Sequence, residues 1–178
     1  MTTSQKLETN VEKIISAKHP DPFFYLGMHP GPKGQGLVVR ALLPQAKRVH
    51  VVETAKGTVL AELPKVHDVG LFDGPVKRTG QIFPYRLRIE TESGIQEIED
   101  PYRFPPILGE MDVYLIAEGK HLRLDEKLGA HLMNMEGVSG VGFAVWAPNA
   151  ARVSVVGDFN NWDGRRHPMR FRVECGVW

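Results

Sequence analysis

The sequence is poor in several features that mark whole classes of protein. Its 178 residues include one cysteine, Cys175. A single thiol cannot form an internal disulfide, which favours a reducing compartment. No run of about 18 apolar residues is present, so no membrane span is expected. The opening segment, MTTSQKLETN, lacks the apolar stretch of a secretory signal. These absences predict a cytoplasmic protein with no membrane partner.

The charge balance, the histidine spacing and the glycine pattern give no sign of a nucleic-acid, metal or nucleotide site. Lysine and arginine total 22 against 21 acidic residues, and no basic cluster extends beyond Arg165-Arg166. Nucleic acid is therefore not an expected partner. The seven histidines show no HxxxH or Cys-His spacing, so no metal site is predicted. No glycine-rich nucleotide motif occurs, so no cofactor is expected.

The most informative stretch is residues 140–164, GVGFAVWAPNAARVSVVGDFNNWDG. Apolar alternation in its first part breaks at Pro148-Asn149-Ala150, which is a turn signal. The valine-rich run 153–156 is short and β-branched, as expected of a strand. The segment 157–164 then combines glycine, aspartate and asparagine, which favour tight turns, with two aromatic residues. Strand, turn, strand and polar aromatic loop is the layout of a small β-sandwich.

The letters FAVWAPNAARVSVVGDFNNWDG resemble the start of a known module. It is the immunoglobulin-like carbohydrate-binding module of glycogen-branching and debranching enzymes of the α-amylase superfamily. The later stretch DPYRFPP, followed by GEMDVYLIAEGKHLRL, resembles the linker of bacterial glycogen-branching enzymes that carry two such modules. The resemblance covers residues 20–178. It implies modules that hold α-1,4-glucan or glycogen and pack on the catalytic (β/α)₈ barrel of the same enzyme.

An internal repeat supports two modules. GLVVRALLPQAKRVHVV (36–52) aligns without gaps on GVGFAVWAPNAARVSVV (140–156). Upstream, LGMH (26–29) matches LGAH (128–131), and downstream GLF (70–72) matches GVW (176–178). A repeat of this length is one unit fold used twice. The equivalent residues His29 and His131 are expected to be hydrogen-bonded structural residues at strand starts.

The rest of the chain reads as short strands with short helices. Thr9 to Lys18 carries a Thr9-x-x-Glu12 capping box and predicts a helix. Helical turns are also expected at 110–116 and 124–128. Strand candidates, separated by glycine or proline, are 37–43, 49–52, 58–63, 85–90 and 95–98, with Ser93-Gly94 as a hairpin turn.

The predicted fold class is all-β, with two tandem immunoglobulin-like β-sandwich modules and short helices at the N-terminus and in the linker. The predicted domains are 1–118, a first sandwich with leading helix and linker, and 119–178, a second, truncated sandwich. Because the first copy continues with further strands before DPYRFPP, the second copy is expected to be incomplete. We therefore expect the first module to be more stable, and residues 140–178 to promote self-association.

No catalytic residue is predicted. Asp158 and Asp163 flank Trp162, but both lie in a turn context where aspartate commonly bonds nearby backbone N–H groups. The resemblance places the catalytic carboxylates in a barrel, which needs at least ~200 residues of its own. Isolated, this chain should therefore have no branching or hydrolytic activity.

Trp162 is the strongest candidate for sugar binding, because an indole ring buries the flat C–H face of a sugar well. Asn160, Asn161 and Asp163 would supply donors and acceptors for hydroxyl groups. Packing of Trp162 on its own sandwich, or on a barrel, is an open alternative. Trp146 is expected in a core or interface, and Trp178 in the core. The competing functions are a glycogen-targeting scaffold module and a plain interaction sandwich without sugar affinity.

Overall fold

The structure is a computed structural model that describes residues 10–32, 36–78 and 80–178. It divides into two compact units, Met1–Arg103 and Phe104–Trp178. The predicted leading helix is present over residues 10–15. Thr9, the cap of its predicted capping box, lies outside the described residues. The sequence had placed the domain boundary near residue 118, later than this division.

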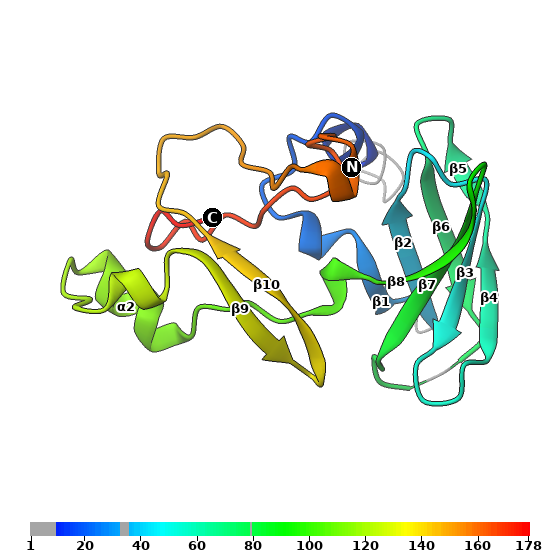
Figure 1. The fold of residues 1–178 in the computed structure, drawn as a ribbon, viewed down its shortest axis with the longest axis horizontal. Coiled ribbons are helices and arrows are strands. Elements are labelled where there is room, and N and C mark those ends of the chain that lie inside the picture. Colours follow the sequence, from blue (N-terminus) through cyan, green and yellow to red (C-terminus); the bar gives the residue numbers. More distant parts are fainter. Residues whose placement is uncertain (1–9, 33–35, 79) are drawn as a thin grey trace. The chain divides into compact units, whose positions relative to one another are not determined.

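The first unit is a sandwich of two four-stranded antiparallel sheets (Figure 1). One sheet has the strand order β1-β2-β6-β5 and the other β4-β3-β7-β8. In chain order, the strands are β1 Gly27–Pro30, β2 Leu37–Leu42, β3 Arg48–Glu53, β4 Val59–Leu63, β5 Lys65–His67, β6 Leu71–Val76, β7 Tyr85–Thr91 and β8 Gly94–Glu99.

Alternating side chains from both sheets form the core of this sandwich. On β2, Leu37, Val39 and Ala41 point inward, and on β7 Leu87 and Ile89 do the same. On β7 the burial alternates along the strand, as expected of a half-buried strand, whereas β2 is buried on both faces. A second cluster on the other face of the β1-β2-β6 sheet includes a residue of the leading helix. Its buried members are Ile14, Tyr25, Leu26, Leu42 and Leu71.

All five strand candidates of the first unit are confirmed within one or two residues at their ends. Three strands were missed: β1, β5 and β6. The β7–β8 turn lies at residues 92–93, with Gly94 already paired to Thr91, so the predicted turn was one residue too late. The all-β fold class is confirmed.

The second unit contains an α-helix, short 3₁₀ turns and one long hairpin. The helix α2 is Glu110–Ala117, and the hairpin joins β9 Gly129–Met135 to β10 Val138–Ala144. The 3₁₀ turns are η4 Leu124–Glu126 and η5 Asp158–Asn160. Both predicted helical segments are thus confirmed.

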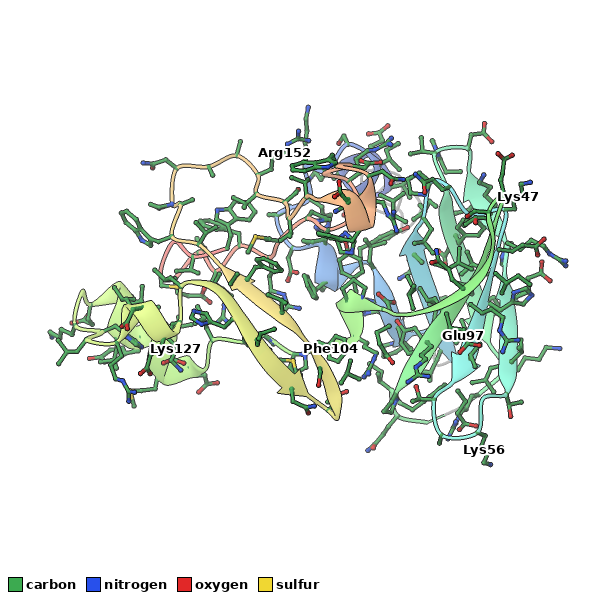
Figure 2. All side chains as sticks on the ribbon, in the orientation of Figure 1. Lys47, Lys56, Glu97, Phe104, Lys127 and Arg152 are labelled. Carbon is green, nitrogen blue, oxygen red and sulfur yellow. The ribbon has the colours of Figure 1, made fainter. Side chains whose placement is uncertain are left out.

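A small core ties the connector to the second unit. Leu108 and Val113 are buried together with Ala144 and Val177. Asp112 of α2 bonds the Nε2 atom of His121 at 3.0 Å and the Nζ atom of Lys127 at 3.1 Å (Figure 2 shows Lys127 beside α2). These contacts explain why the structure divides after Arg103.

Backbone pairing shows that the two units repeat the same sheet. Gly27 pairs with Arg40 in the first unit. The residues aligned with these two, Gly129 and Ala144, pair with each other in the second unit. Leu42 pairs with Leu71, and the aligned residues Trp146 and Val177 form a bridge. The repeat seen in the sequence is therefore a repeat in strand register.

The repeat extends upstream into the segment that the sequence presented as a linker. The 3₁₀ turn η1, Pro22–Phe24, corresponds to η4, and each is closed by a 2.8 Å bond from the following leucine, Leu26 or Leu128. His19 accepts from the N–H of Asp21 at 3.2 Å, and His121 accepts likewise from Arg123 at 3.2 Å. Helix α2 is therefore the leading helix of the second unit.

The equivalent histidines His29 and His131 do what the sequence predicted. Each donates from Nε2 to the carbonyl of a leucine three residues earlier, Leu26 or Leu128, at 2.8 Å in both cases. They are structural residues at the starts of β1 and β9.

The valine-rich run 153–156 is not a full strand. It makes one bridge, Ser154 to Pro168, flanked by bonds of 3.0 Å from Val155 N–H to His167 and 2.9 Å from Met169 N–H to Val153. The same positions in β3 pair with β4 on one side and β7 on the other. A strand gains its regular form from ladders with its neighbours, and this run has a single short ladder within the described chain.

Among the described residues, no helix has the length and apolar character needed to cross a membrane. Across the same residues, no group of three or more histidine, cysteine or acidic side chains is arranged to hold a metal ion.

Candidate functional site

The loop 157–164 leaves the short ladder of the second unit through one turn of 3₁₀ helix, η5. Asn161 and Trp162 follow with φ of 54° and 57°, both in the left-handed region. Asparagine is one of the few non-glycine residues that visit this region readily, whereas tryptophan does so rarely. Two consecutive residues of this kind turn the chain sharply and place Trp162 at the loop surface.

Asn160 is fully buried and holds this loop together. Its Oδ1 accepts the N–H of Gly157 at 2.9 Å. Its Nδ2 donates to the carbonyl of Val155 at 2.8 Å and to Nδ1 of His167 at 2.9 Å. The sequence proposed Asn160 as a partner for sugar hydroxyls, but its amide faces inward because the turn leaves backbone groups that need partners.

Asp163 is also engaged within the loop. Its carboxylate accepts from the backbone N–H of Arg165 at 3.0 Å and from the guanidinium at 2.6 and 2.8 Å. These hydrogen bonds from Arg165 hold the pKa of Asp163 below its usual range. The predicted turn role of Asp163 is confirmed, and its charge is matched by a neighbour.

Trp162 is one of the two predicted site residues that are exposed. Its side chain is 67% exposed, and its indole Nε1 donates to Oδ1 of Asp158 at 3.0 Å. The bond fixes one edge of the ring and leaves ring surface in contact with solvent. Asn161, next to it, is exposed as well. An open, oriented indole is suited to stacking on the apolar face of a pyranose ring.

Phe159 is a further exposed aromatic that the sequence reasoning did not single out. Phe159 is 62% exposed. Its ring packs edge to face on the imidazole of His167, with 5.4 Å between the two ring centroids. The signal was present in the sequence, because Phe159 and Trp162 are spaced three residues apart in one polar turn.

The other tryptophans divide between surface and core. Trp178 is buried and donates its Nε1 to the carbonyl of Ala147 at 3.0 Å, as predicted. Trp146 is 61% exposed, so it is not a core residue of this chain. Cys175 is a buried free thiol.

One buried acid outside the loop has a clear structural role. Asp100, at the end of β8, accepts hydrogen bonds from the Tyr85 hydroxyl and from the N–H of Tyr102. Complete burial raises the pKa of Asp100 to about 6, in spite of these donors. The pair joins β7 to the η3 turn, Pro101–Arg103, and lies within the first unit.

Comparisons with known proteins bear directly on this architecture. A family model described as alpha-1,4-glucan branching enzyme GlgB, N-terminal domain, matches residues 7–102, more than half of the chain. The chain belongs to this family. A second model, carbohydrate-binding module 48 (isoamylase N-terminal domain), matches residues 127–178. The resemblance drawn from the sequence is thereby confirmed, and the candidate loop falls inside the module 48 match.

Several curated relatives of this GlgB N-terminal region share about half of its residues. The chain is 52% identical to a 1,4-alpha-glucan branching enzyme GlgB from Rubrobacter xylanophilus over 96% of its length. It is 53% identical to the Cereibacter sphaeroides enzyme over 96% of this chain, and 50% identical to the Pseudomonas aeruginosa enzyme over 100% of this chain. The chain spans 23–24% of the length of these relatives.

Proposed function

We propose that this chain is the non-catalytic, glucan-binding and positioning region of a 1,4-alpha-glucan branching enzyme of glycogen biosynthesis, acting in the cytoplasm. The relatives that carry that name are about four times as long as the chain, because it covers 23–24% of them. In this proposal, the two units hold an α-1,4-glucan and contact the catalytic barrel of the same enzyme. The chain by itself then catalyses no transfer or hydrolysis.

The observation that carries the binding proposal is the open indole of Trp162. It is exposed at 67% and oriented by Asp158, at the surface of a turn inside the module 48 match. Asn160 and Asp163 shape this turn, and Asn161 is the exposed polar neighbour. Exposed Phe159 adds apolar surface on the same loop.

The test is calorimetric titration of the 178-residue chain with a maltooligosaccharide. Stacking on one indole contributes roughly 1–3 kcal/mol, if nucleic-acid bases are a fair analogue. With the contacts of neighbouring side chains added, we expect a dissociation constant near ~1 mM, which corresponds to about 4 kcal/mol. Trp162→Ala should weaken binding by about tenfold, which corresponds to 1.4 kcal/mol. Trp146→Ala is the matched control, because that indole is nearly as exposed but lies outside the loop.

Equal binding by the wild type and Trp162→Ala would remove Trp162 from the site. No binding by the wild type at any attainable concentration would favour the plain interaction sandwich. Catalysis is checked separately: an iodine-staining assay on α-1,4-glucan with the purified chain should show no change, and turnover would contradict the non-catalytic assignment.

A further inference from the structure

The contact between Asn160 and His167 reaches from the loop to the strand pair beneath it. The orientation of the Asn160 amide is fixed by two backbone groups. Its Oδ1 faces the N–H of Gly157 at 2.9 Å, and its Nδ2 faces the carbonyl of Val155 at 2.8 Å. Because both ends are assigned in this way, the group that points at His167 is the N–H donor of Nδ2.

This orientation dictates the protonation of His167. Nδ1 must present a lone pair to Asn160 at 2.9 Å, so the imidazole is neutral and carries its proton on Nε2. In the imidazolium form, Nδ1–H would face a second donor. Turning the Asn160 amide over would restore that bond, but it would place a donor against the N–H of Gly157 and an acceptor against the carbonyl of Val155.

The same contacts connect His167 to the indole. The carbonyl of Gly157 accepts the backbone N–H of Trp162 at 3.0 Å and that of Asn160 at 3.1 Å, while its N–H is held by the Asn160 side chain. Gly157 is thus fixed on both sides, and the left-handed turn that presents Trp162 starts from it.

We infer that Asn160 and neutral His167 are positioning residues, which hold the turn in the shape that presents Trp162 to a glucan, and that protonation of His167 releases this turn. The inference rests on the proposed glucan-binding function of Trp162. It adds a pH dependence to that site and assigns the buried asparagine a role other than sugar contact.

The charges around His167 keep it neutral near pH 7. Burial, followed by the cationic neighbour Arg166, lowers the pKa of His167 to about 4. The loop's carboxylates face other groups: Asp158 accepts from Trp162 and Asp163 from Arg165. From η5, His167 also meets the uncharged ring of Phe159.

The sign of the effect follows from linkage. We call the loop closed when Asn160 bonds His167 and open when this contact is broken. In the open loop the pKa of His167 is near its ordinary 6.5, so the histidine binds more protons there than in the closed loop. Loop closure is therefore fully favoured above pH 6.5, and it weakens progressively as the pH falls through 6.5 towards 4. Glucan affinity should fall over the same interval.

In the first unit, the turn that follows β3 has no equivalent of the contact between Asn160 and His167. Val51 pairs with Ala61 there, whereas the aligned Val155 pairs with His167. An alanine offers no acceptor for a loop side chain. The turn that follows β3, residues 54–58, is instead closed by backbone bonds between Glu53 and both Thr58 and Gly57, at 2.9 and 2.8 Å.

The test measures maltoheptaose binding by the 178-residue chain from about pH 7 to about pH 4, where half-protonation of His167 predicts about a twofold loss of affinity. His167→Asn should bind as the wild type does near neutral pH, because its Oδ1 takes the place of Nδ1 and can accept from Asn160, and its affinity should not fall in acid. His121→Gln is the control for a second part-buried histidine of the same unit, and should keep the wild-type pH profile. His167→Ala should bind weakly at every pH.

A readout without glucan separates this inference from the proposed function. The indole ¹H–¹⁵N resonance of Trp162 reports on the turn, and that of Trp178 serves as an internal reference. On acidification, the Trp162 signal should move in Asp158→Asn, in which the partner of the indole N–H does not titrate, but not in the double variant Asp158→Asn/His167→Asn, while the Trp178 signal stays in place. If the signal moves equally in the double variant, or the Asp158→Asn signal is unchanged down to about pH 4, where His167 would be half protonated, the inference is wrong. Absence of glucan binding with the expected indole shifts would overturn only the proposed function.

Discussion

The two units share one sheet register but differ at the turn that follows the aligned valines. In the first unit, β3 and β4 are joined by residues 54–58, a short turn with Lys56 at its tip (Figure 2). In the second, residues 157–164 form a longer loop with Phe159 and Trp162 exposed. The sheet is therefore the constant part of the repeat, and the connection that follows it carries the candidate site, as is common for loops on a fixed scaffold.

The units also differ in how much of the sheet is covered. The inward positions of β2 are buried, whereas the aligned residues Val141, Phe143 and Val145 are each at least 40% exposed. Likewise, β3 has two neighbouring strands, and the run 153–156 has one short ladder. The first unit should accordingly be the more stable one.

Hydrogen exchange should show the largest difference between the units. Amides of β3 and β7 should exchange at least ~100-fold more slowly than those of residues 153–156, because the former open only in global unfolding. The measurement is native-state exchange followed by mass spectrometry or NMR. If the slowest-exchanging amides lay within residues 140–178, the second unit would be the more stable one, contrary to this prediction.

Substitution of Gly70 should cost the first unit about 3 kcal/mol of unfolding free energy. Gly70 has φ of +96°, and an added Cβ would lie 2.4 Å from the Cα of Pro44 and 2.6 Å from the oxygen of Leu43. These are backbone atoms that cannot easily move aside. Urea unfolding of Gly70→Ala gives the value.

Gly57 provides the matched control. It also has positive φ, +66°, but nothing lies within 4 Å of the position its Cβ would take. Gly57→Ala should cost only about 1 kcal/mol from backbone strain. Equal losses in the two variants would show that the close approach of Gly70 to residues 43–44 is unimportant.

The stability of the first unit should depend on the ionisation of Asp100. Its pKa is raised by burial from 3.8 to about 6, so the folded state binds the extra proton and the contribution of Asp100 is greatest below pH 3.8. That contribution is lost as the pH rises through 6. Relative to Asp100→Asn, the wild type should therefore lose about 3 kcal/mol between acid and neutral pH.

Urea unfolding of both proteins across this range measures the effect. Lys56→Gln is the control, because Lys56 lies in an exposed turn and is distant in sequence from Asp100. Its unfolding free energy should change with pH as that of the wild type does. A constant difference between the wild type and Asp100→Asn at all pH values would mean that the carboxyl does not titrate in this interval.

Much of the fold was predictable from the sequence because alternation and turn residues mark most strands. The strands β2 and β3 follow from their apolar runs and the break at Pro44. The strand β6 was missed because Asp73, Gly74 and Pro75 read as a turn. Pairing with β2 on one side and β5 on the other overrides that local signal.

The candidate site was only partly predictable. The polar loop with Trp162 at its surface follows from the letters GDFNNWDG. Which of the adjacent residues Asn160 and Asn161 turns inward does not, because it depends on the unpaired backbone groups of the finished turn. The role of His167 was also out of reach, because its partner is defined by the pairing of residues 153–155 with 167–169.

The most direct test of the account is a map of glucan contacts on the 178-residue chain. Maltoheptaose is titrated into ¹⁵N-labelled protein, and the shifted amide and indole resonances are assigned. We predict that the shifts cluster in residues 157–164, including the Trp162 indole, and that residues 54–58 are unaffected. Shifts confined to residues 54–58 or to other surfaces, with 157–164 unchanged, would contradict the assignment of the glucan site to the loop of the second unit.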